Sequence, residues 1–260
     1  MHLNHAQTAL ARLCRPPNGS HLPTAEQIEH AIYNGYIDPT TRNDEQHTQG
    51  PLRKIKIRRH AKADRIVFAT EDDEQTHHAR LIAALIVAPV LGHRTHEDTH
   101  GFRTGRGVHT AIAAIVEHAS TRGPDTVIAQ CDVSDAFNSM NARTAIAMMP
   151  PRTRKYLTAI QERYREHVGP SAGFPQGHPA GPAIANYVID LALASARNSR
   201  TPARIFGYAD DLSCTAAHTN IETTLGEIAD GLASHGMHLN PEKTRVTKIR
   251  HGATTTILGY

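Results

Sequence analysis

The feature that most limits how this chain can fold is an apolar segment that runs directly into two adjacent acidic residues. Residues 206–211 read Phe-Gly-Tyr-Ala-Asp-Asp. Strand-forming residues on both sides of the pair predict a hairpin with Asp210 and Asp211 at its turn. Taken alone, such a pair is also typical of a solvated turn, so its meaning depends on what else the chain carries.

Two further segments give the acidic pair a chemical interpretation. Residues 126–131, Thr-Val-Ile-Ala-Gln-Cys, predict a buried strand that ends in Asp132, and residues 173–177, Gly-Phe-Pro-Gln-Gly, open a helix. Like charges resist sharing a site that excludes water, and a divalent cation removes that cost. Mg²⁺ prefers carboxylate and phosphate oxygens, and two such ions can promote phosphoryl transfer. Acids brought together at strand ends would therefore suit a divalent-cation site of the kind that promotes phosphoryl transfer.

Composition narrows the setting of this chemistry. The chain has 260 residues, and its 39% hydrophobic content is ordinary for a globular protein. Its formal charge of +3 neither demands nor excludes nucleic acid, but residues 53–62 are strongly basic, which indicates a solvated face or a binding surface. The three cysteines are far apart, so we expect no disulfide framework and a reducing, cytoplasmic compartment. The longest apolar run, 81–91, is too short to span a membrane, so no membrane is expected.

The order of the predicted elements indicates an α+β fold. Residues 1–51 predict a separate N-terminal extension with one short helix at 24–32. Strands are expected as a pair within 52–68, at 126–131, as a pair flanking 208–211 and as a pair near 244–260. Helices are expected from the acids at 71–74 to about Leu91, at 108–119, on either side of Pro150-Pro151, at 179–196 and at 221–234. Helices and short strands in this irregular order favour α+β over a doubly wound sheet.

These segments resemble the palm motifs of reverse transcriptases, in the order in which that family carries them. Residues 132–137 are similar to its Asp-x-x-x-Ala-Phe strand end, 173–177 to its Pro-Gln-Gly turn and 208–211 to its Tyr-Ala-Asp-Asp hairpin. Further similarities are a Leu-Asn-x-x-Lys-Thr segment at 236–244, the start of the primer grip at 258–260, a basic fingers strand at 62–65 and a Gly-Phe-Arg-x-Gly-Arg loop at 101–106. That loop is typical of the bacterial group II intron and retron-like type, and the resemblance covers residues 52–260.

The resemblance implies a right-hand polymerase with fingers and palm, in which an antiparallel palm sheet is backed by helices. Residues 52–122 would form the fingers with part of the palm, and 123–260 the palm, ending at a hairpin like the primer grip. It also implies an RNA-directed DNA polymerase that adds dNTPs to a 3′ hydroxyl, with an RNA template and a DNA primer or product as partners. Two Mg²⁺ ions, or Mn²⁺ in their place, would be its cofactors.

The resemblance assigns catalytic roles position by position. We expect the metal ligands to be Asp132, the main-chain carbonyl of Val133, Asp210 and Asp211, with Asp211 more electrostatic than coordinating. Lys243 is expected to be the acid that protonates departing pyrophosphate. A solvated lysine after a helix is the alternative reading of Lys243.

The resemblance also assigns residues that contact the nucleotide and the nucleic acid. Phe137 stands where the family places a steric gate against the ribose 2′-hydroxyl, and ordinary core packing is the alternative. The other expected nucleotide-binding residues are Lys62 and Arg65, which would bind the triphosphate, and Gln176 and Gly177, which would lie along the nascent base pair. Residues expected to contact nucleic acid are Arg58, Arg103, Arg106, Tyr208, Leu258 and Gly259.

Most family members continue past the final hairpin into a helical thumb, whereas this sequence ends at Tyr260. We therefore expect a partner protein, a structured RNA or self-association to replace the thumb, with residues 1–52 as a docking surface or a simple cap. Alternatives are a defence-type reverse transcriptase with an unusual primer or template, an RNA-dependent RNA polymerase, and a non-catalytic nucleic-acid-binding subunit on the same fold. The three acids argue against the last, because a scaffold has no reason to keep them beside polyanionic RNA. No zinc site is expected at His93, His96 and His100.

Overall fold

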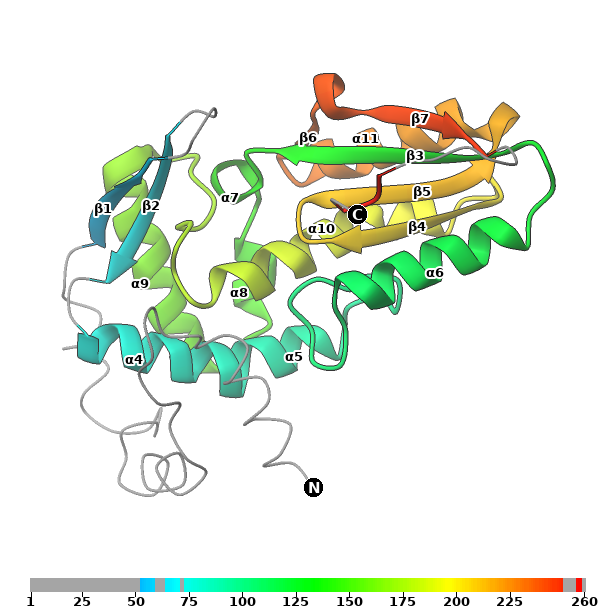
Figure 1. The fold of residues 1–260 in the computed structure, drawn as a ribbon. Coiled ribbons are helices and arrows are strands. Elements are labelled where there is room, and N and C mark those ends of the chain that lie inside the picture. Colours follow the sequence, from blue (N-terminus) through cyan, green and yellow to red (C-terminus); the bar gives the residue numbers. More distant parts are fainter. Residues whose placement is uncertain (1–51, 59–63, 71–72, 250–255, 259–260) are drawn as a thin grey trace. The chain divides into compact units, whose positions relative to one another are not determined.

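The computed structural model describes residues 52–58, 64–70, 73–249 and 256–258 (Figure 1). Their contacts group them into two compact units. The first takes the described part of Met1–His93 together with Ala142–Ile184, and the second takes Arg94–Asn141 together with the described part of Ala185–Tyr260. Neither unit is continuous in the sequence, because the chain enters each of them twice.

A basic hairpin belongs to the first unit. β1 (Leu52–Ile57) pairs antiparallel with β2 (Arg65–Thr70), with Leu52 opposite Thr70 and Ile57 opposite Arg65. Successive side chains of a strand point to opposite faces, and one face of this hairpin buries Leu52 and Phe68 against Tyr164. The rings of Phe68 and Tyr164 meet edge to face with centroids 5.0 Å apart. The expected strand pair is therefore confirmed, while the turn between its strands lies outside the described residues.

Proline marks two of the helix boundaries in the first unit. α4 (Asp73–Ile82) continues through a π-helical turn, η1 (Ala83–Val87), into α5 (Ala88–Gly92). Pro89 lacks the N–H that would bond the carbonyl of Leu85, and the wider turn directly precedes it. α8 (Arg143–Ala147) and α9 (Pro151–Val168) lie on either side of Pro150, as expected. Pro151 suits the first position of α9 because that position needs no N–H donor.

A five-stranded antiparallel sheet forms the centre of the second unit. Its strands are β3 (Thr126–Ser134), β4 (Ala203–Tyr208), β5 (Asp211–Ala217), β6 (His238–Leu239) and β7 (Arg245–Lys248). β4 is an edge strand, β5 joins it to β3, and β6 and β7 both pair with β3. In Figure 1 β3 accordingly runs between β5 and β7. Val127, Ile128 and Ala129 are all buried, because helices cover both faces of this strand.

The helices of the second unit are α6 (Val108–Ser120), the short α7 (Ala136–Ser139) and α11 (Ile221–Ser234), and α10 (Gly181–Arg197) contributes most of its length. α6 buries Ile115 against Ile128 and Phe206 of the sheet, and Figure 1 shows α10 and α11 behind the strands. α11 approaches α10 so closely that a Cβ on Gly231 would lie 2.0 Å from the carbonyl oxygen of Ala192. Two short helical turns, η2 (His218–Asn220) and η3 (Pro241–Lys243), complete the unit.

The mixed fold with an antiparallel sheet confirms the predicted α+β class. The predicted strand at 126–131 extends to Ser134, and the helices predicted at 108–119, 179–196 and 221–234 are α6, α10 and α11. The strand pair expected near 244–260 is only half seen: β7 pairs with β3, and residues 256–258 are not a strand. The helix expected at 24–32 lies outside the described residues. Among the helices that are described, none is both long and apolar enough to cross a membrane.

Candidate active site

The three predicted acids meet at one end of the sheet in the second unit. Asp132 on β3 and Asp211 on β5 are directly opposed Cα partners in the antiparallel register. Asp210 belongs to the turn between β4 and β5, and its carbonyl oxygen accepts a 2.9 Å hydrogen bond from the N–H of Val133. Ala209 allows the tight turn by adopting a φ of 57°. The backbone thus places Asp132 and Asp211 on paired strands and Asp210 in the turn next to them.

The electrostatics of the three acids are those of a crowded negative site. The pKa of Asp211 is raised, first by partial removal from water and then by the negative charges of Asp210 and Asp132, while Lys243 opposes the rise. Lys243 donates from Nζ to Asp132 Oδ1 over 2.9 Å. That hydrogen bond is also the main cause that raises the pKa of Lys243 and holds its ammonium charged. One ammonium therefore faces three carboxylates.

Lys243 is brought to Asp132 by the segment that follows α11. The N–H of Asn240 donates to the carbonyl of Asp132 over 2.7 Å. Asn240 also caps η3, because its side chain accepts from the N–H of Glu242 at 3.1 Å, and its carbonyl accepts from the Thr244 hydroxyl at 2.9 Å. The Leu-Asn-x-x-Lys-Thr segment is thereby fastened to the end of β3.

The three carboxylates are suitable ligands for Mg²⁺, although their side chains are not arranged as a metal-binding group in this structure. Within the described part of the chain, no group of three or more His, Cys, Asp or Glu residues is arranged to hold a metal ion. The hard carboxylate oxygens are nevertheless the ligands that Mg²⁺ prefers. Partial removal from water, followed by the negative charges of Asp210 and Asp132, raises the pKa of Asp211, and a divalent cation would offset these charges more fully than Lys243 does.

Phe137 follows the acidic strand on the short helix α7. The chain turns into this helix at Asp135, whose φ of 44° is left-handed and tolerated by aspartate. The side chain of Asn138 donates to Asp135 Oδ1 over 2.7 Å, which secures the turn. Phe137 is half-buried, whereas the neighbouring Ala136 is buried. Phe137 is therefore not fully enclosed in the core.

In the first unit, the Pro-Gln-Gly turn lies against the basic hairpin. The carbonyl oxygen of Gln176 accepts a 2.6 Å hydrogen bond from the N–H of Phe68 on β2. Gly177 has a φ of 111°, and a Cβ there would come within 2.9 Å of the Phe68 carbonyl oxygen, so only glycine fits. Arg58 and Arg65, at the end of the hairpin where β1 leads into β2, are exposed. Lys62 lies outside the described residues.

His178 follows this turn, and sequence reasoning missed it. It is buried, its Nδ1 accepts from the N–H of Ala180 at 3.2 Å, and its Nε2 lies 3.2 Å from the Tyr156 hydroxyl. Because Nδ1 accepts, the ring proton is on Nε2 and is available to Tyr156. A histidine directly after the Pro-Gln-Gly turn was the sequence signal that could have drawn attention to it.

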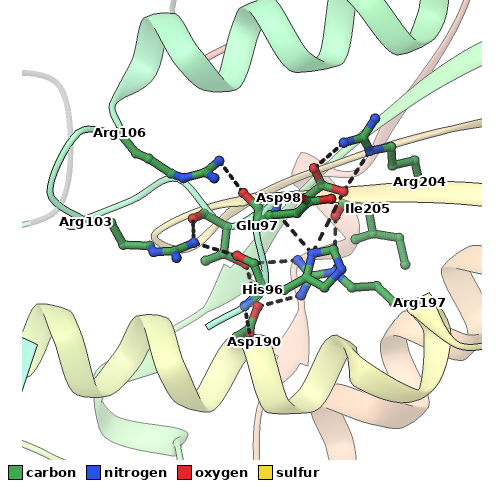
Figure 2. Close-up of polar contacts among 10 residues, drawn as sticks. His96, Glu97, Asp98, Arg103, Arg106, Asp190, Arg197, Arg204 and Ile205 are labelled. Carbon is green, nitrogen blue, oxygen red and sulfur yellow. Dashed lines mark hydrogen bonds and ion pairs between the residues drawn. The ribbon is translucent and has the colours of Figure 1, made fainter. Parts of the chain in front are cut away.

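Two of the three arginines expected to contact nucleic acid, Arg103 and Arg106, also bond main-chain carbonyls within the protein. Arg103 donates from Nη1 to the carbonyls of His96 at 2.6 Å and Thr99 at 2.8 Å, and Arg106 donates to the carbonyl of Glu97 (Figure 2). Leu258 packs partly buried against the core cluster of α6 and β3. Tyr208 ends β4 opposite Asp211, and Gly259 lies outside the described residues.

Sequence reasoning also missed a set of charged residues that are bonded together around the edge strand β4: Asp98, Asp190, Arg197 and Arg204. Asp190 interrupts an otherwise apolar helix, and an acid in such a helix is the signal that could have identified it.

A comparison with known protein families gives one match over most of the chain. A family model described as reverse transcriptase (RNA-dependent DNA polymerase) matches residues 75–260. The match includes the three acids, Phe137 and Lys243, whereas the hairpin of β1 and β2 precedes it. A search of curated proteins found no match.

Proposed function

This chain belongs to the reverse transcriptase family, and we propose that it is an RNA-directed DNA polymerase that extends a 3′ hydroxyl at Asp132, Asp210 and Asp211. The family is one of nucleotidyltransferases, so a template, a primer and nucleoside triphosphates are the substrates that membership implies. The proposal adds the residues, the choice of RNA as template and of dNTPs as substrates.

The observation that carries the proposal is the register that opposes Asp132 to Asp211 beside the Asp210 turn. Exposed acids that served only solubility would have no reason to be aligned on paired strands. Their mutual repulsion raises the pKa of Asp211 after partial loss of water, which is a cost that a structural role does not explain. A binding site for cations does explain it.

We propose that two Mg²⁺ ions, or Mn²⁺ in their place, are held by the three carboxylates and the main-chain carbonyl of Val133. When bound, such ions supply activation of the attacking hydroxyl and stabilisation of the leaving oxygen. The protein contributes the fixed spacing of the carboxylates, which the strand register and the hydrogen bond from Val133 to Asp210 maintain.

Lys243 is proposed as the proton donor to pyrophosphate. Its raised pKa keeps the ammonium protonated at neutral pH, so a proton is available. The same hydrogen bond to Asp132 makes Lys243 a weaker acid, so donation requires that this bond be given up. The exposed position of the Lys243 side chain, 60% accessible, leaves it free to move toward the product.

The remaining assignments are proposals that rest on the family resemblance. We assign Phe137 to the sugar gate, and Lys62, Arg65, Gln176 and Gly177 to nucleotide binding. The sheet-bearing unit is proposed as the palm and the hairpin-bearing unit as the fingers, which moves residues 142–184 from the expected palm to the fingers. The group II intron and retron-like subtype rests on the 101–106 loop.

The test is primer extension with purified full chain on matched RNA and DNA templates, with each dNTP and with Mg²⁺ or Mn²⁺. The proposal predicts extension on the RNA template that requires a divalent ion and dNTPs. A folded protein that binds primer–template tightly but extends neither template would instead be a non-catalytic subunit.

A further inference from the structure

A segment before α6 lies along the free edge of β4, next to the catalytic turn. The N–H of Gly207 donates to the carbonyl of Asp98 over 2.9 Å, and the N–H of His100 donates to the carbonyl of Gly207 over 2.7 Å. Thr99 and Gly207 form a parallel bridge. The segment then passes so close to the turn that a Cβ on Gly101 would lie 2.5 Å from the Ala209 nitrogen. Residues 98–101 thus border the edge of β4 through one bridge, and Gly101 reaches the turn.

A buried ion pair holds this segment to α10. The carboxylate of Asp190 accepts from the N–H of His96 at 2.9 Å, from the Thr99 hydroxyl at 2.6 Å and from Arg197 Nη1 at 2.5 Å (Figure 2). Arg197 also donates to the Thr99 hydroxyl at 3.0 Å and to the Ile205 carbonyl on β4 at 3.3 Å. The side chains of Asp190 and Arg197 are each only 8% exposed. This pair therefore binds the segment, the helix and the strand together.

A second ion pair fastens the same segment to β4 directly. Arg204 donates from Nε and Nη2 to the two carboxylate oxygens of Asp98, both at 2.8 Å. Such a two-pronged pair fixes orientation as well as distance. Arg103 and Arg106 close the following loop by donating to carbonyls of residues 96, 97 and 99 (Figure 2).

Stability alone does not account for these ion pairs. Removing two charges from water costs about as much as their attraction returns, so a buried pair contributes little to stability relative to apolar residues of the same shape. These ion pairs instead fix the positions of the groups they join, because each hydrogen bond defines where one donor lies. The groups they position are the backbone atoms that flank Tyr208 to Asp211.

We propose that Asp190–Arg197–Thr99 and Asp98–Arg204 form a brace that positions the Asp210–Asp211 turn for catalysis. These are positioning residues, since none of them belongs to the proposed metal-binding set. The expected effect on catalysis rests on the proposed function. The expected effect on the position of the turn rests on the hydrogen bonds of Gly207 alone. Hydrogen exchange measures the position of the turn, and kcat measures the effect on catalysis.

Thr99→Val and Thr99→Ser are the decisive variants. Valine has the shape of threonine but removes the hydroxyl that bridges Asp190 and Arg197, whereas serine keeps it. We expect hydrogen exchange at the amides of residues 207–211 to become faster in Thr99→Val and to stay near wild type in Thr99→Ser. We expect Thr99→Val to lower kcat roughly 10- to 100-fold with little change in the KM for dNTP, and Thr99→Ser to restore most of it. The affinity for Mn²⁺, measured by electron paramagnetic resonance, should fall in Thr99→Val alone.

The outcomes distinguish a failure of the brace from a failure of the proposed active site. Unchanged exchange, or unchanged kcat with faster exchange, in a folded Thr99→Val protein would overturn the brace. If Thr99→Val does not fold, Arg204→Lys at the more exposed pair decides by the same criteria, because lysine keeps the charge and loses the two-pronged geometry. Lys248→Ala, which breaks an exposed pair with Asp125, is the control and should change nothing. If Asp210→Asn retains wild-type incorporation, the proposed function fails while the exchange result still judges the brace.

Discussion

Asp132 and Asp211 stand opposite each other as Cα partners on β3 and β5, and Lys243 donates to the Asp132 carboxylate over 2.9 Å. The strand register therefore brings together two acids that are far apart in the sequence, and the lysine partly compensates their charge. A second aspartate–lysine pair, Asp125 with Lys248, lies toward the other end of β3 at 3.3 Å, with Asp125 81% exposed. These two aspartate–lysine pairs, one on β3 and one at the residue before it, allow matched tests.

Lys243→Ala should slow single-turnover nucleotide incorporation by roughly 100-fold, the contribution typical of one proton donor. Lys248→Ala removes a lysine of the same sheet and should leave the rate unchanged. Equal rates for both variants, measured by rapid quench with a primed RNA template, would mean that Lys243 only neutralises Asp132.

Phe137→Val should admit ribonucleotides, because a smaller side chain leaves room for the 2′-hydroxyl. We expect the preference for dNTP over rNTP, taken as a ratio of kcat/KM values, to fall roughly 10- to 100-fold. The half-buried ring makes this variant tolerable to the fold. A preference that does not change would assign Phe137 to core packing.

Two glycines of α11 should respond to alanine in opposite directions. Gly226 has nothing within 4 Å of an added Cβ, so Gly226→Ala should raise the free energy of unfolding by roughly 0.5–1 kcal/mol through helix propensity. Gly231→Ala should lower it by about 1–3 kcal/mol, because its Cβ would lie 2.0 Å from the Ala192 carbonyl oxygen. Urea denaturation measures both, and a stabilised Gly231→Ala protein would refute the close contact of α10 and α11.

The stability of the fold should decline as the pH falls below about 6.5, the ordinary pKa of histidine. Burial first, and the positive charge of Arg106 second, lower the pKa of His100. The folded chain therefore favours neutral His100, while the unfolded chain binds the proton more readily. The stability that His100 contributes above pH 6.5 is lost as the pH falls toward the lower pKa of the folded state. Among the described residues His100 Nε2 has no hydrogen-bond partner, so protonation there gains nothing.

His100→Asn should make this pH dependence shallower, since asparagine can still donate to the Thr110 hydroxyl that His100 Nδ1 contacts at 2.9 Å. Substituting the exposed His109 in the same way is the control. Melting temperatures between pH 5 and 8 give the comparison. An identical slope in wild type and His100→Asn would show that other groups carry the dependence.

The sequence predicted the elements whose signals are local. The apolar run at 126–131 and the acid pair at 210–211 identified β3 and the β4–β5 hairpin, because a strand pattern ending in charge has few alternatives. The register of Asp132 with Asp211 could be inferred only through the family resemblance, since pairing of distant strands leaves no local trace.

Other features depend on tertiary contacts and could not be predicted. The family resemblance assigned Arg103 and Arg106 to nucleic-acid contact, which stays a prediction. The structure adds that their guanidinium groups bond main-chain carbonyls of the segment that borders β4. The sequence alone does not show that these arginines will bond the carbonyls of residues 96, 97 and 99, because those carbonyls are brought near them only when the segment lies beside Gly207. The same holds for Gly177, whose glycine is required by the approach of Phe68.

The most direct test of the central claim is nucleotide incorporation by Asp210→Asn beside Asp125→Asn, on a primed RNA template with Mg²⁺. Both changes neutralise one aspartate, and both variants should fold, as circular dichroism and melting temperature will show. We predict that Asp210→Asn loses at least roughly 100-fold in rate while Asp125→Asn retains the wild-type rate. Incorporation near the wild-type rate by a folded Asp210→Asn protein would contradict the assignment of the three acids as the catalytic site.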